Sequence, residues 1–155
     1  MYRHLARVFL LSLLIALPSL HAQRELLTPD QIEQVEKKWP GTKRTATGIR
    51  YIVLKEGAGE SPKSGDRVNV LYIGSLLDGT EFDRTQDPSR PFTFRVDRGE
   101  VITGWDQIIK TMKVGEKRIV IIPSSLGYGS RGQAPKIPRD AVLVFEMELI
   151  SQGSE

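Results

Sequence analysis

Apolar and polar residues alternate along most of residues 48–151, which is the pattern of strands with one buried face. The last stretch shows it most clearly, because Leu143, Phe145 and Met147 fall on one face. The dipeptide Asp78–Gly79 is typical of the tight turn of a β-hairpin. The predicted strands cover residues 49–54, 67–73, 91–96, 118–122 and 141–150, with a further strand that begins at residues 81–83.

The period of the pattern changes at residues 105–112. Four apolar residues there have the spacing i, i+3, i+4 and i+7: Trp105, Ile108, Ile109 and Met112. This spacing predicts a short amphipathic helix. The fold class is therefore α+β, an antiparallel sheet of about five strands covered by one short helix.

A second helix is predicted within residues 23–47. Thr28 is a suitable N-cap, Pro29 fits the first helical position, and Gln31 completes a capping box. Apolar residues then recur at helical spacing: Ile32, Val35 and Trp39. A helix of about three turns is marginally stable alone. It therefore docks on the domain, contacts a second copy in a weak dimer, or frays, and residues 42–47 are expected to be a polar linker.

Residues 1–22 have the features of a secretory signal peptide. Arg3 and Arg7 precede an uncharged, mostly apolar run of 13 residues from Val8 to Leu20, and Ala22 follows it. A membrane-spanning helix needs about 20 residues, so we expect cleavage after Ala22 and an exported protein, periplasmic or secreted, without a stable membrane anchor. The chain then divides into residues 23–47 (helix and linker), 48–151 (one domain) and 152–155 (tail).

The composition excludes several kinds of chemistry. The chain of 155 residues has no cysteine, and both of its histidines, His4 and His21, lie in the predicted signal peptide. The remaining chain could form no disulfide, no histidine-based catalytic site and no histidine-ligated metal site. Loss of Arg3 and Arg7 lowers the formal net charge from +3 to +1, and the aromatic residues do not cluster with lysines. We therefore expect no metal, no cofactor and no nucleic-acid partner.

Residues 127–132 match the dinucleotide-binding pattern G-x-G-x-x-G. That pattern holds a pyrophosphate only where a helix begins directly after the glycines, and Pro135 and Pro138 forbid such a helix here. We predict a tight loop instead. Tyr128 is a large aromatic residue in this loop with no periodic core to join, which makes it a candidate functional residue.

Four carboxylates follow one another along the predicted hairpin: Asp78, Glu81, Asp83 and Asp87. Paired carboxylates catalyse glycoside hydrolysis, so a hydrolase that uses Asp83 is one hypothesis. A solvated hairpin is the simpler interpretation, because Asp78 belongs to the turn and Arg84 follows the other two.

Several short blocks of sequence follow one another between Gly48 and Ile150. They are Val70–Gly74, Asp78–Asp83, Pro91–Phe94, Glu100–Trp105, Val114–Glu116, Ile122–Pro123, Tyr128–Gly129 and Leu143–Glu146. In their order and spacing, these blocks resemble the FK506-binding-protein (FKBP) type of peptidyl-prolyl isomerase. No single block would be specific enough, but the series is.

The resemblance implies a five- to six-stranded antiparallel half-barrel wrapped round one short helix, with a pocket between them. By position, the catalytic residues of the family fall on Tyr72, Phe82, Asp83, Trp105, Tyr128 and Phe145, and the substrate-binding residues on Phe92, Val101, Ile102 and Ile137. Trp105 would lie beneath the proline ring, whereas the Ile102 N–H and the Tyr128 hydroxyl would bind substrate carbonyl groups. Proline-containing polypeptides would be the substrates, and FK506-type macrolides are candidate ligands.

Three residues depart from the common pattern of the family: Pro88, Gln133 and Lys136. Pro88 stands where relatives often have an arginine that pairs with the pocket aspartate. Arg84 or Arg90 could replace that partner, or Asp83 relies on Tyr72 alone. Gln133 and Lys136 change the rim, so substrate preference and inhibitor affinity stay open.

The physics of proline isomerisation suits a chain without histidine or cysteine. Rotation about the peptide bond has a barrier of about 18–20 kcal/mol, but it makes and breaks no covalent bond. The twisted amide is less dipolar than the planar one, so an apolar aromatic pocket stabilises it preferentially. The leading hypothesis is an isomerase that helps exported proteins fold. A non-catalytic binding module or chaperone that uses the same groove is the alternative.

Overall fold

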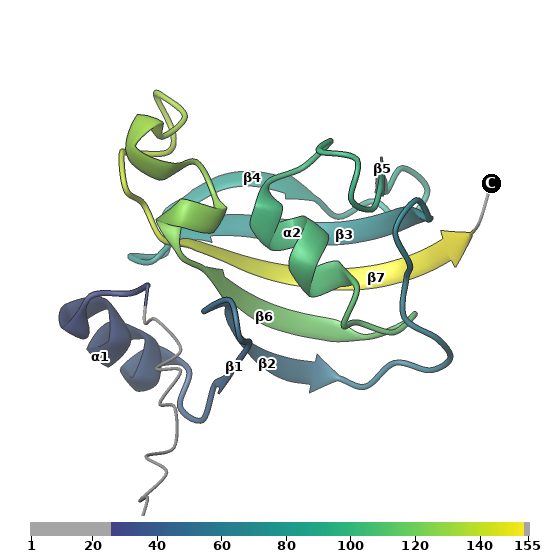
Figure 1. Cartoon of the computed structure of the whole chain (residues 1–155), viewed down its shortest axis with the longest axis horizontal. Helices are drawn as coiled ribbons and strands as arrows, with labels where there is room; N and C mark the ends of the chain where they lie inside the picture. Colours follow the sequence, from purple (N-terminus) through teal and green to yellow (C-terminus); the bar gives the residue numbers. More distant parts are fainter. Residues whose placement is uncertain (1–25, 154–155) are drawn as a thin grey trace, which may run out of the picture.

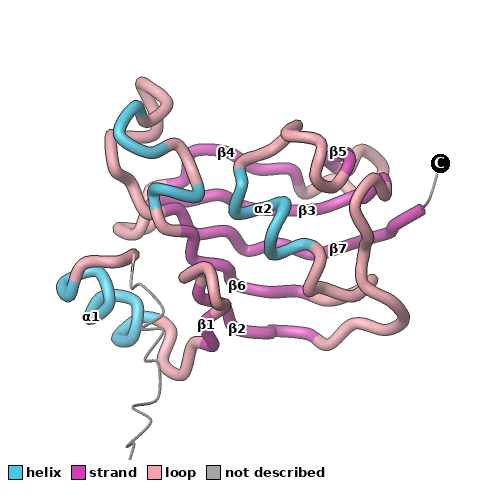
Figure 2. The backbone as a smooth tube through the Cα atoms, viewed as in Figure 1, coloured by secondary structure: helices cyan, strands magenta, loops and turns pink. Residues whose placement is uncertain are grey.

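The computed structural model describes residues 26–153, in which one antiparallel sheet of seven strands accompanies two α-helices (Figure 1; Figure 2). The strands are β1 (Lys43–Arg44), β2 (Arg50–Lys55), β3 (Arg67–Leu76), β4 (Glu81–Thr85), β5 (Phe92–Arg95), β6 (Lys117–Ile122) and β7 (Leu143–Gly153). The helices are α1 (Pro29–Lys38) and α2 (Thr103–Ile109), with short 3-10 turns η1 (Ser124–Leu126) and η2 (Gly129–Arg131). The strand order is β1-β2-β6-β7-β3-β4, and β5 pairs with β3.

The predicted α+β class with an antiparallel sheet is confirmed, although the strand count differs. Five to six strands were expected, and the structure has seven in residues 26–153. The additional strand, β1, lies inside the stretch predicted to be a linker and pairs with β2, with Lys43 opposite Tyr51. Two charged residues carry no alternating pattern, so backbone pairing alone defines this strand.

The core lies between the sheet and α2, which crosses one face of the sheet (Figure 1). The four apolar residues predicted for the helix are all buried: Trp105, Ile108, Ile109 and Met112. α2 itself ends at Ile109, and the chain continues as a turn in which the Met112 N–H donates to the Ile109 carbonyl. Burial of each such side chain contributes about 1.5–3 kcal/mol, which fixes the helix against the sheet.

Helix α1 has the predicted capping box. The Thr28 hydroxyl accepts from the Gln31 N–H, and the Gln31 side chain accepts from the Thr28 N–H. Its apolar face packs against the outer face of the sheet, where Val35 is fully buried. The sheet residues in this second cluster are Ile119, Ile121 and Val144, and Val142 joins them from the position just before β7. The apolar face of α1 is thus occupied by the domain, which is the first of the three arrangements expected for it.

A buried ion pair at the start of β6 is linked by hydrogen bonds to the turn that follows α2. The guanidinium of Arg118 on β6 donates to the Glu116 carboxylate, to the Thr111 hydroxyl at 2.8 Å and to the Thr111 carbonyl at 2.7 Å. The second Glu116 oxygen accepts from the Lys113 N–H at 2.8 Å. The aromatic ring of Tyr51 lies 4.5 Å from the guanidinium carbon. These contacts hold the turn after α2 in place.

The predicted signal peptide, residues 1–22, lies outside the described residues. Within residues 26–153, no helix is long and apolar enough to cross a membrane.

Candidate active site

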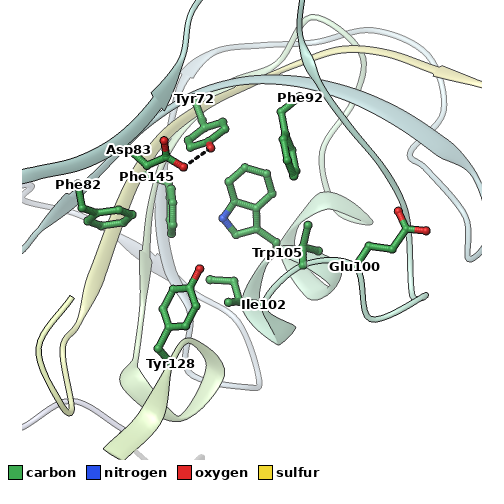
Figure 3. A pocket seen from close by; sticks show the side chains of 10 residues that line it. Tyr72, Phe82, Asp83, Phe92, Glu100, Ile102, Trp105, Tyr128 and Phe145 are labelled. Atoms are coloured by element: carbon green, nitrogen blue, oxygen red, sulfur yellow. Dashed lines mark hydrogen bonds between the residues drawn. The ribbon is translucent and has the colours of Figure 1, made fainter. Parts of the chain in front are cut away.

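A pocket of about 230 Å³ opens between α2, the sheet and the η1–η2 loop (Figure 3). Nine of the ten residues predicted for the site line it: Tyr72, Phe82, Asp83, Phe92, Val101, Ile102, Trp105, Tyr128 and Phe145. Strands β3, β4, β5 and β7, helix α2 and two loops supply these residues. The antiparallel pairing of β3 with β4, β5 and β7 brings together segments that are far apart in the sequence.

Trp105 forms the base of the pocket and is only 4% exposed. Tyr72 and Phe92 meet its ring edge to face, with centroids at 4.9 and 5.8 Å. Phe145 packs against it at 5.2 Å with the ring planes at 84°. Such edge-to-face pairs are favourable beyond their buried area. They fix the indole plane at the bottom of the pocket.

Phe82 and Phe145 form one wall, with ring centroids 5.7 Å apart at 86°. Gly74 on β3 makes room for them. A methyl group at Gly74 would lie 2.6 Å from Phe82 Cε2 and 2.9 Å from Phe145 Cε1. Any other residue at this position would therefore displace the wall of the pocket.

Asp83 is held mainly by Tyr72. The Tyr72 hydroxyl donates to Asp83 Oδ2 at 2.6 Å, and the Arg84 backbone N–H donates to Oδ1 at 2.9 Å. The side chain of Arg84 pairs with Glu81 and that of Arg90 with the Asp87 carboxylate. Neither arginine replaces the missing partner, and of the three arrangements left open by Pro88 the structure has the one with Tyr72.

The other hairpin carboxylates have local partners. Asp78 accepts from the Thr80 N–H at 2.8 Å, and Asp87 accepts from the Ser89 N–H at 2.9 Å. Glu81 accepts two bonds from Arg84, both at 2.7 Å. This arrangement is that of an exposed, hydrogen-bonded hairpin, and it favours the simpler interpretation of the acidic residues over a hydrolase site.

Tyr128 points its hydroxyl into the pocket from the loop between η1 and η2 (Figure 3). Burial raises the pKa of this phenol, and the negative charge of Asp83 raises it further. Burial and the hydrogen bond to Asp83 also raise the pKa of Tyr72. Since an ordinary tyrosine titrates near pKa 10, both phenols stay protonated at neutral pH. They act as hydrogen-bond donors, not as bases.

The loop that follows Tyr128 has the tight form predicted for it. Gly132 has φ 63°, and a Cβ there would lie 2.5 Å from the Ile137 carbonyl oxygen. Residues 129–131 form the 3-10 turn η2, and no α-helix follows the glycines. The loop thus lacks the helix start that a dinucleotide site needs.

Ile137 is the one predicted site residue outside this pocket. It is 4% exposed and packs into the core beside a second cavity, which residues 133–137 line together with Phe82, Asp83 and Tyr128. Glu100 lines the main pocket but was not predicted. Its carboxylate accepts from the Arg95 N–H at 2.9 Å. A single acidic residue in a loop belongs to no periodic pattern, so the sequence does not indicate that Glu100 lines the pocket.

The pocket combines an apolar aromatic enclosure with hydroxyl donors at its rim. In residues 26–153 there is no group of three histidine, cysteine, aspartate or glutamate side chains that could hold a metal ion. The indole N–H of Trp105 has no hydrogen-bond partner within the described part of the chain. The arrangement suits binding of an apolar ring with a flanking amide more than attack by a nucleophile.

Comparison with known proteins gives the class to which this fold and pocket belong. Residues 58–150 match the FKBP-type peptidyl-prolyl cis-trans isomerases, and the chain belongs to this family. The bovine peptidyl-prolyl cis-trans isomerase FKBP2 is 52% identical over 114 residues, which are 68% of this chain and 81% of that protein. FK506-binding protein 4 of Dictyostelium discoideum is 47% identical over 119 residues, 76% of this chain but 32% of that longer protein.

Solved structures agree with this assignment. A peptidyl-prolyl cis-trans isomerase from Pseudomonas syringae is 37% identical with a TM-score of 0.70, covering 80% of this chain and 91% of that one. FkpA from Escherichia coli is 41% identical with a TM-score of 0.71, covering 81% of this chain and 58% of that one. The expected FKBP-like fold is confirmed.

Proposed function

We propose that the pocket around Trp105 binds the proline of an X–Pro segment and accelerates rotation about the preceding amide bond. The observation that carries this proposal is a pocket of about 230 Å³ lined by six aromatic side chains, with Trp105 at its base. Tyr72, Phe82 and Phe145 form the walls, and Phe92, Val101 and Ile102 surround the opening. Proline-containing polypeptides are the proposed substrates and FK506-type macrolides the proposed inhibitors.

The proposed mechanism is non-covalent. Twisting the amide removes its resonance and lowers its dipole. The transition state therefore loses less hydration free energy than the planar ground state when the amide moves from water into an apolar pocket. Hydrogen bonds from the Tyr128 hydroxyl and the Ile102 N–H to substrate carbonyl groups would hold the flanking segment. Each 1.36 kcal/mol or so of preferential stabilisation accelerates isomerisation about tenfold.

We expect Tyr128→Phe to lower kcat/KM for a proline-containing peptide by about two- to tenfold, because a typical hydrogen bond contributes about 0.5–1.5 kcal/mol. A protease-coupled peptide assay measures this, and the same assay with an FK506-type macrolide shows whether the pocket binds that inhibitor. Tyr51→Phe is the matched control, since Tyr51 lies outside the pocket, beside Arg118. Equal rates for wild type and Tyr128→Phe would contradict the role of the hydroxyl. No acceleration by the wild type would contradict the enzyme assignment and favour a binding module.

We also propose that the protein is exported and acts on the folding of other exported proteins. The charged start, apolar run and small residue of segment 1–22 support this. N-terminal sequencing of the exported protein should begin at Gln23. An exported protein that keeps Met1–Ala22 would show that the segment is not a cleaved signal peptide.

The burial of Val35 supports a monomer as the working assembly, because the domain already covers the face of α1 that could join two copies. The proposed boundary at residue 48 therefore divides the chain into residues 23–47 and 48–151, and the described part of the first segment packs against the second. The unit of residues 48–151 carries α1 on the outer face of its sheet and β1 at the edge beside β2.

A further inference from the structure

A second cavity of about 330 Å³ adjoins the proline pocket. The two cavities share three lining residues, Phe82, Asp83 and Tyr128. The remaining wall of the second cavity is the loop of residues 133–137. The shared lining makes the two cavities direct neighbours, so a residue next to a proline bound in the first would lie toward the second.

Lys136 is an exposed residue at the edge of this cavity. Its Nζ donates to the backbone carbonyl of Phe82 at 2.9 Å, which joins residues 54 positions apart in the sequence. An ammonium group has three donors, so two remain for other acceptors. Within residues 26–153, no carboxylate forms an ion pair with Lys136.

Two carboxylates lie near Lys136. Both oxygens of Asp83 accept hydrogen bonds from neutral donors, the Tyr72 hydroxyl and the Arg84 N–H, so the charge of Asp83 stays in the cavity. Glu81 forms its ion pair with the Arg84 side chain at 2.7 Å. The pKa of Glu81 is lowered first by its hydrogen bond from Arg84 and also by the charge of Lys136. Lys136 is therefore the charged group of the second cavity with donor capacity left for a ligand.

We propose that the second cavity is a subsite for the residue beside the substrate proline, and that Lys136 makes it select an acidic side chain. The proposal rests on the proposed function, because it places the proline in the first pocket. A glutamate or aspartate side chain supplies the carboxylate that Lys136 lacks. Phe82 and Ile137 contact the apolar part of that side chain.

Four peptides test this subsite: one pair with Glu or Gln directly before the proline, and one pair with Glu or Gln directly after it. In wild type, one of the two pairs should show a Glu:Gln ratio of kcat/KM of about two to five, the range of a partly exposed ion pair. Lys136→Gln should bring that ratio to one, whereas Lys136→Arg should keep most of it. The ratio should also fall as salt is raised.

Lys37→Gln is the matched control, because it removes the same charge from an exposed position on α1. It should leave the ratio at its wild-type value. A ratio of one for both pairs in wild type, or a ratio that falls equally with Lys37→Gln, would overturn the proposal. So would faster turnover of a peptide with Lys in place of Glu, which would assign the subsite to Asp83. The Gln peptides separate the isomerase proposal from the subsite proposal. If the wild type does not isomerise the Gln peptides, the proposed isomerase function is contradicted, whatever the subsite selects.

Discussion

Gly74→Ala is expected to lower kcat/KM for a proline-containing peptide by about tenfold, which corresponds to about 1.4 kcal/mol of lost transition-state stabilisation, because the added methyl group overpacks the wall of the pocket. The added methyl group would meet Phe82 Cε2 at 2.6 Å, Phe82 Cζ at 2.8 Å and Phe145 Cε1 at 2.9 Å. Both rings belong to the wall of the pocket. Relief of these contacts must shift at least one of the two rings or the backbone of β3, and either shift changes the shape of the pocket wall.

The control is Gly153→Ala near the end of β7, where an added Cβ would meet nothing within 4 Å. It should keep the wild-type kcat/KM. Unfolding of both variants in guanidinium chloride shows whether each is fully folded under the conditions of the isomerase assay. A folded Gly74→Ala variant with the wild-type rate would show that the positions of these two rings do not control isomerisation.

Arg118→Met is expected to lower the free energy of unfolding by about 3–5 kcal/mol, because it leaves a buried carboxylate without its partner. The Arg118 and Glu116 side chains are only 6% and 4% exposed. The loss should fall on the whole domain, since these two residues join the turn after α2 to β6. Denaturant unfolding monitored by tryptophan fluorescence measures it.

Arg90→Met is the matched control, because its ion pair with Asp87 is exposed, with side chains 87% and 48% accessible. Such pairs contribute about 0–1 kcal/mol. The double variant Glu116→Gln, Arg118→Met should recover part of the stability, because it removes the unpaired charge. Equal losses for Arg118→Met and Arg90→Met would show that the buried pair does not stabilise the domain.

The elements that the sequence predicted are those with a repeating pattern or a cap. The alternation of residues 141–150 corresponds to β7, and Thr28 with Gln31 marks the start of α1. The turn at Asp78–Gly79 has the left-handed glycine expected of it, with φ 95°. Each of these signals comes from residues close together in the chain.

The features that the sequence did not predict depend on contacts between distant segments. β1 forms because its backbone reaches β2, and no side-chain pattern encodes that. Glu100 lines the pocket because of the path of the loop before α2. The partner of Asp83 stayed open among three alternatives until the geometry of Tyr72 was known, and the contact of Lys136 with Phe82 has no local signal. The family resemblance predicted which residues line the pocket, but their hydrogen bonds became known only from the three-dimensional structure.

The position of β7 has a consequence for the order in which the chain can fold. This strand comes last in the described chain, yet it pairs with both β3 and β6 and contributes Val144 to the cluster that covers α1. During synthesis, α1 and the central strand β3 therefore leave the ribosome well before their shared partner. Contacts between such distant segments form slowly. Until β7 is made, one edge of β3 and one edge of β6 stay unpaired, and exposed edges of this kind favour aggregation.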